Sequence, residues 1–350
     1  MKIRSAFRTA VTVLGFKAKR QKILSVDYLL TSRCNLRCSF CLRPSLSSEL
    51  STQKALKVVD ESCRLAPPLF HFSGGEPLLR KDLPVLANRA SDEGCIVGLS
   101  TNGTLFNRSK AEKIARVFDR IGISIDGFQQ IHDKYRGMGT FKKAVQAIKW
   151  LKSFGAEVGV YVIIAPWNIE VVPNFIEWLR NEVRVNFVLV QPVHPYPPPS
   201  ENRPLHEAVL RLSNYLVRLK RTDPNFLVVP MNFIKGIESF FDGKVPKICH
   251  AAELYIAIDP LGNLLACPGR SDIVLGNILD TPINEILNDK TNTSDWFKVE
   301  TCQGCWLNCT TQASMIVSIS YTEVLHLISG LMKVKLRARA SYRSDFQKGY

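Results

Sequence analysis

The sequence has no uncharged apolar run of about 18 or more residues, so it predicts no conventional transmembrane helix. It has no repeat of fixed period and, apart from one proline-rich run, no low-complexity segment. The basic first 20 residues have only a short, interrupted apolar centre and no small-residue cleavage site, unlike a secretory signal. Hydrophobic residues make up 46% of the 350 residues and charged residues 22%, which excludes global disorder. We therefore expect a folded cytoplasmic protein.

Acidic residues are absent from residues 1–26, which carry seven Lys or Arg. Near the other end the basic residues are Lys333, Lys335, Arg337, Arg339 and Arg343, and the two ends hold most of the net charge of +15. Apolar residues are interleaved with the basic ones at both ends, which favours basic amphipathic segments at 1–22 and 313–350. One interpretation of these segments is that they dock on the inner face of a membrane through anionic lipid, whereas nucleic acid is the less expected phosphate partner. Solvated tails, or helices packed on the folded core, are the alternatives.

Short β-rich runs alternate with amphipathic helical stretches between residues 23 and 191, which predicts a parallel α/β sheet or barrel. The expected strands are 23–31, 69–73, 95–100, 120–125, 158–165 and 184–191. Helices are expected at 52–65 and 141–154, with Pro173 in the first turn of a shorter one. Six β/α units without a seventh or eighth predict an incomplete barrel with an open side for a large substrate.

A proline-rich run from Pro192 to Pro204 predicts a stiff, extended connection that ends the barrel. It opens a linker region over 192–247 that includes a helix at 205–221. Residues 248–312 then form a cysteine-bearing module with little room for a hydrophobic core of its own. A bound metal would compensate for the small core.

Ten cysteines in a cytoplasmic chain indicate metal or redox chemistry rather than disulfides. Cys34, Cys38 and Cys41 follow the first expected strand on one loop, and no His or Cys occurs in the next 20 residues to complete a zinc site. Three thiolates fit a 4Fe-4S cluster whose fourth iron is free to bind a small molecule. Cys63 and Cys95 lie apart, and we expect both to be buried structural thiols.

The C-x3-C-x2-C spacing after a first strand, with Phe40 just before the third cysteine, resembles the signature of radical S-adenosylmethionine (SAM) enzymes. The resemblance implies that the open iron binds the amino and carboxylate groups of SAM. It also implies that an electron from the cluster cleaves SAM, and that the resulting 5'-deoxyadenosyl radical abstracts hydrogen from an unactivated carbon. An electron donor such as flavodoxin or ferredoxin is then an expected partner.

Motifs at the ends of the later strands agree with this resemblance. Ser73-Gly74-Gly75-Glu76-Pro77 resembles the GGEP motif of the family, which binds the methionine ammonium group. The two glycines let the backbone come close to a ligand, and Glu76 can accept hydrogen bonds from a cation. The resemblance extends SAM binding to Asn102, Ser124, Asp126 and Arg136, with Arg136 as the partner of the SAM carboxylate. His71 and His132 are expected to be structural.

The late cysteines resemble the SPASM or twitch extension of radical SAM enzymes, which binds auxiliary Fe-S clusters. They are Cys249, Cys267, Cys302, Cys305 and Cys309, with Gly262 opening a G-x4-C pattern. A complete SPASM module has seven cysteines and two clusters, so these five fit one auxiliary cluster with four ligands. Cys249 and Cys267 with two of the later three are the natural set. A zinc ribbon stays open as an alternative.

The sequence thus predicts an α/β fold: a partial (β/α)6 radical SAM barrel followed by a small C-terminal cysteine-rich Fe-S module. The leading substrate class is a peptide or protein, and the alternative is a membrane lipid or polyprenyl chain. A non-catalytic Fe-S or zinc protein that binds RNA or membrane is the alternative of another class. Beyond the SAM cluster, no residue is predicted as a catalytic acid or base.

Overall fold

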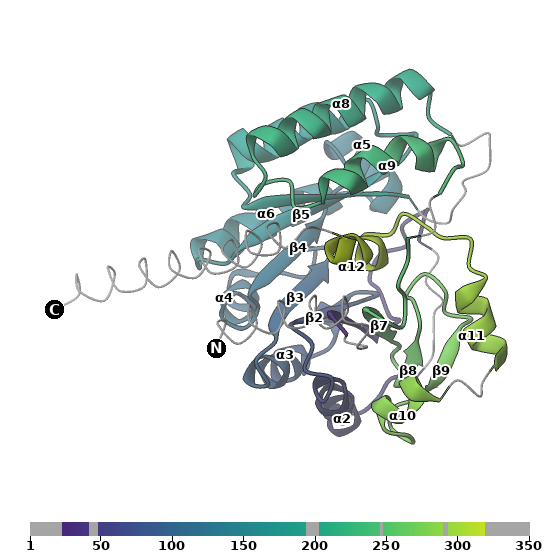
Figure 1. Ribbon diagram of the computed structural model, residues 1–350. Coiled ribbons are helices and arrows are strands. Elements are labelled where there is room, and N and C mark those ends of the chain that lie inside the picture. The colour runs from purple at the N-terminus through teal and green to yellow at the C-terminus, as the bar shows by residue number, and fades with distance from the viewer. Residues whose placement is uncertain (1–22, 42–47, 194–202, 246–247, 290–292, 319–350) are drawn as a thin grey trace.

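The computed structural model describes residues 23–41, 48–193, 203–245, 248–289 and 293–318 (Figure 1). The expected amphipathic segment at 1–22 and nearly all of the one at 313–350 lie outside these residues, as does most of the proline-rich run. None of the helices that the structure describes is long and apolar enough to cross a bilayer.

One sheet organises the described part of the chain, with nine strands in the order β6-β5-β4-β3-β2-β1-β7-β8-β9. The first six strands are parallel, as predicted, and their bounds are β1 Ser25–Thr31, β2 Leu69–Gly74, β3 Ile96–Thr101, β4 Arg120–Ser124, β5 Val158–Ile164 and β6 Phe187–Pro192. These strands start and end close to the predicted positions. The α/β fold class is therefore confirmed.

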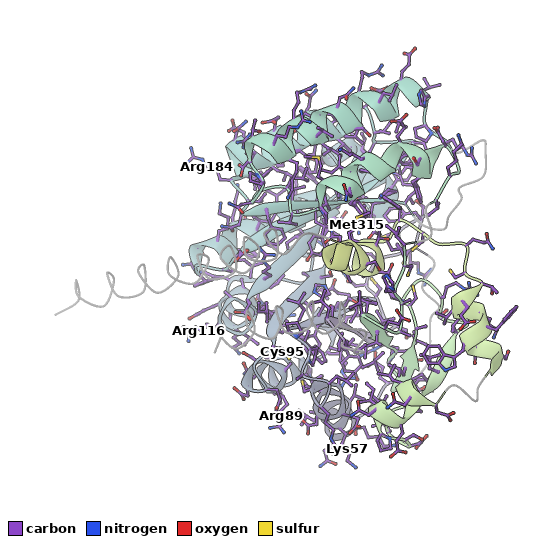
Figure 2. All side chains as sticks on the ribbon, in the orientation of Figure 1. Lys57, Arg89, Cys95, Arg116, Arg184 and Met315 are labelled. Atoms are coloured by element: carbon purple, nitrogen blue, oxygen red, sulfur yellow. The ribbon has the colours of Figure 1, made fainter. Side chains whose placement is uncertain are left out.

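Helices after the strands cover one face of this sheet (Figure 1). They are α2 Thr52–Cys63, α3 Leu83–Asp92, α4 Arg108–Val117, α5 Gln129–Arg136, α6 Thr140–Ser153 and α7 Val172–Trp178, with a short η1 at Pro77–Leu79 and η2 at Leu179–Val183. Helix α2 begins where the Ser51 hydroxyl accepts a hydrogen bond from the Lys54 amide, and Val58 and Val59 are among the residues it buries. Figure 2 shows Lys57, Arg89 and Arg116 projecting from the outside of this helical layer.

Strand alternation gives the sheet two different faces. In β1, Val26, Tyr28 and Leu30 pack into the main hydrophobic core with the covering helices. Since successive side chains point to opposite faces, Asp27 of β1 lies on the inner face, and His71 of β2 is its register partner. The outer face is thus an apolar core, whereas the inner face carries polar groups toward the interior of the partial barrel.

Aromatic rings on the inner face lie against glycines of neighbouring strands. The pairs are His71 with Gly98, Tyr161 with Gly122 and Phe187 with Gly159, and in each pair a Cβ on the glycine would overlap the ring. The rings therefore lie flat on the sheet because the glycines leave room for them.

The sheet continues beyond the six predicted strands. Strand β7 Tyr255–Ile258 pairs in parallel with β1, and β8 Asn263–Leu265 and β9 Val274–Asn277 follow as antiparallel strands. The late part of the chain also forms α8 His206–Thr222, α9 Met231–Phe241, α10 Ile283–Asn288, α11 Thr293–Glu300 and α12 Asn308–Ser318. Its four-residue β7 lies beside the buried β1, so this module shares the core of the barrel.

The two cysteines outside the motifs are buried, as predicted. Cys63 ends α2 and Cys95 precedes β3, and their sulfur atoms are 3.9 Å apart in the core. Figure 2 shows Cys95 inside the molecule near α3.

The ring contact at Gly122 gives a prediction about stability. Gly122→Ala places a methyl group where the Tyr161 ring lies, so overpacking should lower the free energy of unfolding by about 1–3 kcal/mol in urea titrations. Adding Tyr161→Leu removes the ring, and the cost of Gly122→Ala should then shrink. Equal costs in the two backgrounds would contradict this interpretation.

Candidate active site

The three early cysteines lie on the loop that follows β1, at the carboxyl edge of the parallel sheet. Cys34 and Cys41 are exposed and Cys38 is half-buried. The Cys41 amide donates to the Cys38 carbonyl at 3.1 Å, and the Ser39 amide donates to the Tyr135 carbonyl at 3.0 Å. This loop is therefore tied to α5, which belongs to the fourth β/α unit.

The Gly74-Gly75 segment holds the start of the cysteine loop from the other side. The Gly75 amide donates to the Thr31 carbonyl at 2.6 Å, and the Glu76 amide donates to the Arg33 carbonyl at 2.8 Å. A Cβ on Gly75 would overlap the Arg33 carbonyl. The sequence predicted that these glycines let the backbone approach a ligand. The structure gives them a second role: because they have no side chains, the backbone at the end of β2 can contact the backbone at the end of β1.

Glu76 is fully buried and already has protein partners. Its carboxylate accepts hydrogen bonds from the Thr101 hydroxyl at 2.7 Å, the Asn102 amide at 2.8 Å and the Leu78 amide at 3.0 Å. Burial raises the pKa of Glu76, and these three donors act in the opposite direction. Glu76 therefore joins the ends of β2 and β3, and Pro77 follows it as the first residue of η1. The predicted contact of Glu76 with a SAM ammonium group stays a prediction.

Asn102 lies beside the cysteine loop. Its Nδ2 donates to Asn35 Oδ1 at 3.0 Å and lies 4.0 Å from the Cys34 sulfur. Its Oδ1 accepts from the amide and hydroxyl of Thr104. The side chain is therefore held at the edge of the predicted cluster site.

Asp126 and Arg136 form a buried ion pair in which the guanidinium binds both carboxylate oxygens. Asp126 also accepts from the Ile163 amide at 3.0 Å, and Ser124 ends β4 two residues before it. Burial alone would lower the pKa of Arg136, but Asp126 and the thiols of Cys38 and Cys41 raise it. The predicted SAM carboxylate contact of Arg136 stays a prediction, since in this structure the guanidinium holds Asp126.

The charge of Arg136 bears on the cysteines. Burial raises the pKa values of the Cys34 and Cys38 thiols, and Arg136 acts against this shift at Cys38. A cation beside three thiols favours the thiolate forms that iron requires. The donor set thus fits a cluster held by Cys34, Cys38 and Cys41.

An aromatic stack beside the cysteine loop was not predicted from the sequence. Trp167, after β5, stacks on Phe40 with ring centroids 5.8 Å apart and on Tyr135 at 4.4 Å. The buried Trp167 Nε1 has no hydrogen-bond partner among the described residues. The aromatic residue before the third cysteine marked one member of this stack, but nothing in the sequence joined it to a tryptophan more than 100 residues later.

The two histidines have structural partners, in keeping with the prediction. His71 Nε2 lies 2.7 Å from the Ser100 hydroxyl, and burial lowers its pKa. His132 Nδ1 accepts from the Asp126 amide at 3.3 Å, and burial together with Arg136 lowers its pKa to about 4.

All five late cysteines gather at one place, where their charges affect one another. Cys305 contributes to the pKa shifts of Cys249, Cys267 and Cys309, and Cys302 contributes to that of Cys305. Burial is the largest cause at each of these four and raises their pKa values, that of Cys249 to about 11. Cys302 differs from them because it lies beside the Arg270 guanidinium and hydrogen-bonds with it.

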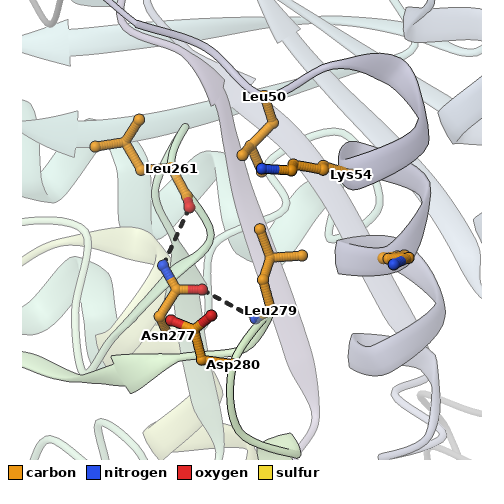
Figure 3. A pocket seen from close by; sticks show the side chains of 7 residues that line it. Leu50, Lys54, Leu261, Asn277, Leu279 and Asp280 are labelled. Carbon is orange, nitrogen blue, oxygen red and sulfur yellow. Dashed lines mark hydrogen bonds between the residues drawn. The ribbon is translucent and has the colours of Figure 1, made fainter.

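A separate surface pocket of about 340 Å³ lies between α2 and the β8–β9 strands (Figure 3). Lys54, Leu261 and Asp280 are among its lining residues, and the Asn277 side chain there is bonded to the Leu261 carbonyl and the Leu279 amide. None of the predicted site residues lines it, so it is not part of this site.

Comparison with known families matches both parts of the chain. The model of the radical SAM superfamily matches residues 28–179, and the model of the SPASM iron-sulfur cluster-binding domain matches residues 249–309. The first span contains the early cysteines, and the second contains all five late ones.

Curated relatives include enzymes of two kinds. Fe-coproporphyrin III synthase of Methanosarcina barkeri is 36% identical over 163 residues, which are 45% of this chain and 41% of that protein. The AdoMet-dependent heme synthase of the same organism is 29% identical over 75% of this chain and 81% of its own length. PqqA peptide cyclase of Granulibacter bethesdensis is 32% identical over 42% of this chain and 41% of its own. The match thus spans about two fifths of the length of two of these relatives.

Among solved structures, Streptococcus suis SuiB bound to its precursor peptide SuiA shares the fold. The TM-score is 0.64 at 12% identity, over 91% of this chain and 76% of that one.

Two predictions follow from this geometry, and the first concerns Gly75. Gly75→Ala should displace the cysteine loop, because the new methyl group overlaps the Arg33 carbonyl. We expect a clear loss of iron and sulfide at the early site after anaerobic reconstitution. Ser39→Ala, an exposed change on the same loop, is the matched control and should keep the wild-type iron content. Full loading of Gly75→Ala would show that the backbone crossing is dispensable.

The second concerns pH and His132. The unfolded chain binds a proton at the ordinary histidine pKa near 6.5, while the folded state binds it only near pH 4, so this histidine makes stability fall as pH drops through that window. Between pH 7 and pH 5 the unfolding free energy should fall by about 2 kcal/mol more in the wild type than in His132→Asn. Identical pH slopes in denaturant titrations would refute this assignment.

The early cysteine loop, the strand-end motifs around it and the gathered late cysteines now agree with both family models. The two matches indicate SAM and a 4Fe-4S cluster as cofactors of the first region and an auxiliary Fe-S cluster in the second. The chain therefore contains a radical SAM superfamily domain over residues 28–179, followed by a SPASM iron-sulfur cluster-binding domain over residues 249–309.

Proposed function

We propose that this enzyme cleaves SAM reductively at a cluster held by Cys34, Cys38 and Cys41 and abstracts hydrogen from an unactivated carbon of its substrate. The observation that carries the proposal is the convergence on one cysteine loop of Gly75 from β2, Asn102 from β3 and Tyr135 from α5. Three thiols on one loop fit a cluster that leaves one iron for SAM.

When bound, the cluster supplies one electron to the SAM sulfonium, and a low-potential donor such as flavodoxin or ferredoxin would replace that electron. The chain's own residues hold the components in place. Arg136 offsets the negative charge of Cys38 and Cys41, and Asp126 fixes the guanidinium. Trp167 stacks on both Phe40 and Tyr135 and so packs against one side of the loop.

For the auxiliary cluster we propose Cys249, Cys267, Cys305 and Cys309 as ligands. Burial raises the pKa values of these four thiols, and each interacts with at least one other member of the set. Cys302, beside Arg270, is then the spare thiol.

The substrate class we propose first is a tetrapyrrole. The relative whose alignment covers most of both chains, at 81% of its own length, is a heme synthase.

A peptide is the second substrate class, favoured by the similarity to PqqA peptide cyclase. The edge strands of the sheet, β6 and β9, do not pair with each other among the described residues, so an extended chain has an open side from which to enter. A membrane lipid depends on the basic segments at both ends, which lie largely outside the described residues.

The test is an anaerobic assay with dithionite and SAM. The wild type should form 5'-deoxyadenosine, and Cys38→Ala should lower its formation to background, while Cys63→Ala, which removes a buried thiol of the core, should retain it. No 5'-deoxyadenosine from iron-loaded wild type would refute the proposal.

The same assay separates the substrate classes. Iron coproporphyrin III should stimulate the formation of 5'-deoxyadenosine and lose hydrogen to it, as followed by deuterium transfer. Stimulation only by a precursor peptide encoded near the gene would favour the second class instead.

A further inference from the structure

Helix α12 lies across the sheet (Figure 1), and its second residue, Cys309, packs against a cluster of buried residues that includes Tyr255 of β7. Its first residue, Asn308, is bonded to β6: the amide donates to Gln191 Oε1 at 3.0 Å, and Nδ2 donates to the Val190 carbonyl at 2.8 Å. One turn later, Ala313 packs with Tyr255 of β7, and Cys309 lies against the same cluster. The helix thus joins the last barrel strand to the first strand of the SPASM module.

Tyr255 is the residue of β7 that meets Cys309 from the sheet. It is almost fully buried, and its hydroxyl donates to Asp27 Oδ2 at 3.0 Å. The other carboxylate oxygen of Asp27 accepts from the hydroxyl of Ser73, which directly precedes the two glycines that hold the cysteine loop. A polar connection therefore runs from the SPASM module to the SAM-binding end of the barrel.

Cys309 and Asp27 are both acceptors for a hydrogen bond from the Tyr255 hydroxyl. Burial and the charge of Asp27 raise the pKa of the Cys309 thiol, whereas a hydrogen bond from Tyr255 lowers it. The pKa of Tyr255 is in turn raised by burial and by Asp27, Cys309 and Cys267. The hydroxyl thus has two acceptors within reach, Asp27 Oδ2 and the sulfur of Cys309, and one proton to share.

We propose that Asp27 and Tyr255 are positioning residues that set the reduction potential of the auxiliary cluster, because the Tyr255 hydroxyl divides its hydrogen bond between Asp27 and the sulfur of Cys309. The inference rests on the proposed assignment of Cys309 as a ligand of that cluster. By this inference, two residues that are not ligands of the cluster affect its reduction potential.

The physical reason is charge. Reduction adds an electron to a buried, already anionic site, so a donor to the cysteine sulfur favours the reduced state and a nearby carboxylate disfavours it. Removing the donor and removing the carboxylate should therefore move the potential in opposite directions. Residues that only fill space would not produce this opposition.

The experiment uses the full-length chain with Cys34, Cys38 and Cys41 replaced by Ala, so that only the auxiliary cluster gives a signal. Midpoint potentials are measured by EPR-monitored redox titration. In this background Tyr255→Phe, which keeps the ring, should lower the midpoint potential. Asp27→Asn, which keeps an oxygen acceptor for Tyr255 and removes the charge, should raise it. Tyr215→Phe on α8 is the matched control, since its hydroxyl also donates to a carboxylate, that of Glu177 at 2.8 Å, and it should leave the midpoint unchanged.

Equal midpoints for the parent, Tyr255→Phe and Asp27→Asn would overturn the inference, as would shifts of the same sign. Cys309→Ser distinguishes a failure of the ligand assignment: an unaltered auxiliary signal in that variant would show that Cys309 does not bind the cluster and would overturn the inference with it. If either single variant fails to fold, the other still reports, because each has its own predicted sign against the parent.

Discussion

The crossing of Gly74-Gly75 over residues 31–33 is the contact on which the active site depends. Two backbone segments meet there without side chains between them, and two amide-to-carbonyl hydrogen bonds fix their separation. Cys34 follows directly after the crossing, so the position of the first thiol is set by the backbone of a neighbouring strand end. Glu76 extends the same arrangement to β3 through Thr101 and Asn102. Contacts between the ends of β1, β2 and β3 therefore position the early site, in addition to the cysteine loop itself.

Buried charges near this site are matched by specific partners. Asp126 and Arg136 satisfy each other, and Asp126 is further held by the amide of Ile163. Asn168 adds a bond from its Nδ2 to the Asp126 carbonyl at 2.7 Å, so the ends of β4 and β5 stay in register. Either charge would be costly to bury without its partner. As a pair, Asp126 and Arg136 place a cation beside Cys38 and Cys41. The buried Asp27 carboxylate near Cys309 is held differently, by hydrogen bonds from the hydroxyls of Tyr255 and Ser73.

Much of this could be predicted from the sequence, and the reasons for the rest are physical. The β-rich runs and the cysteine spacing are local signals, so the six parallel strands and the loop of Cys34, Cys38 and Cys41 could be located in advance. Strand β7 could not, because its four residues carry no periodic pattern and its pairing with β1 joins segments about 230 residues apart. The same holds for the Trp167 stack and for the bond between Tyr255 and Asp27. The motif residues Glu76 and Arg136 were found, but their protein partners depend on contacts that only the folded chain shows.

The account's central claim is that one iron of the early cluster has no protein ligand and binds SAM. The most direct measurement is pulsed EPR of the reduced early cluster, with SAM labelled with 15N at its amino group. The account predicts a hyperfine coupling between that nitrogen and the cluster, and a changed EPR signal on adding SAM. A signal that SAM leaves unchanged, with no nitrogen coupling, would contradict it.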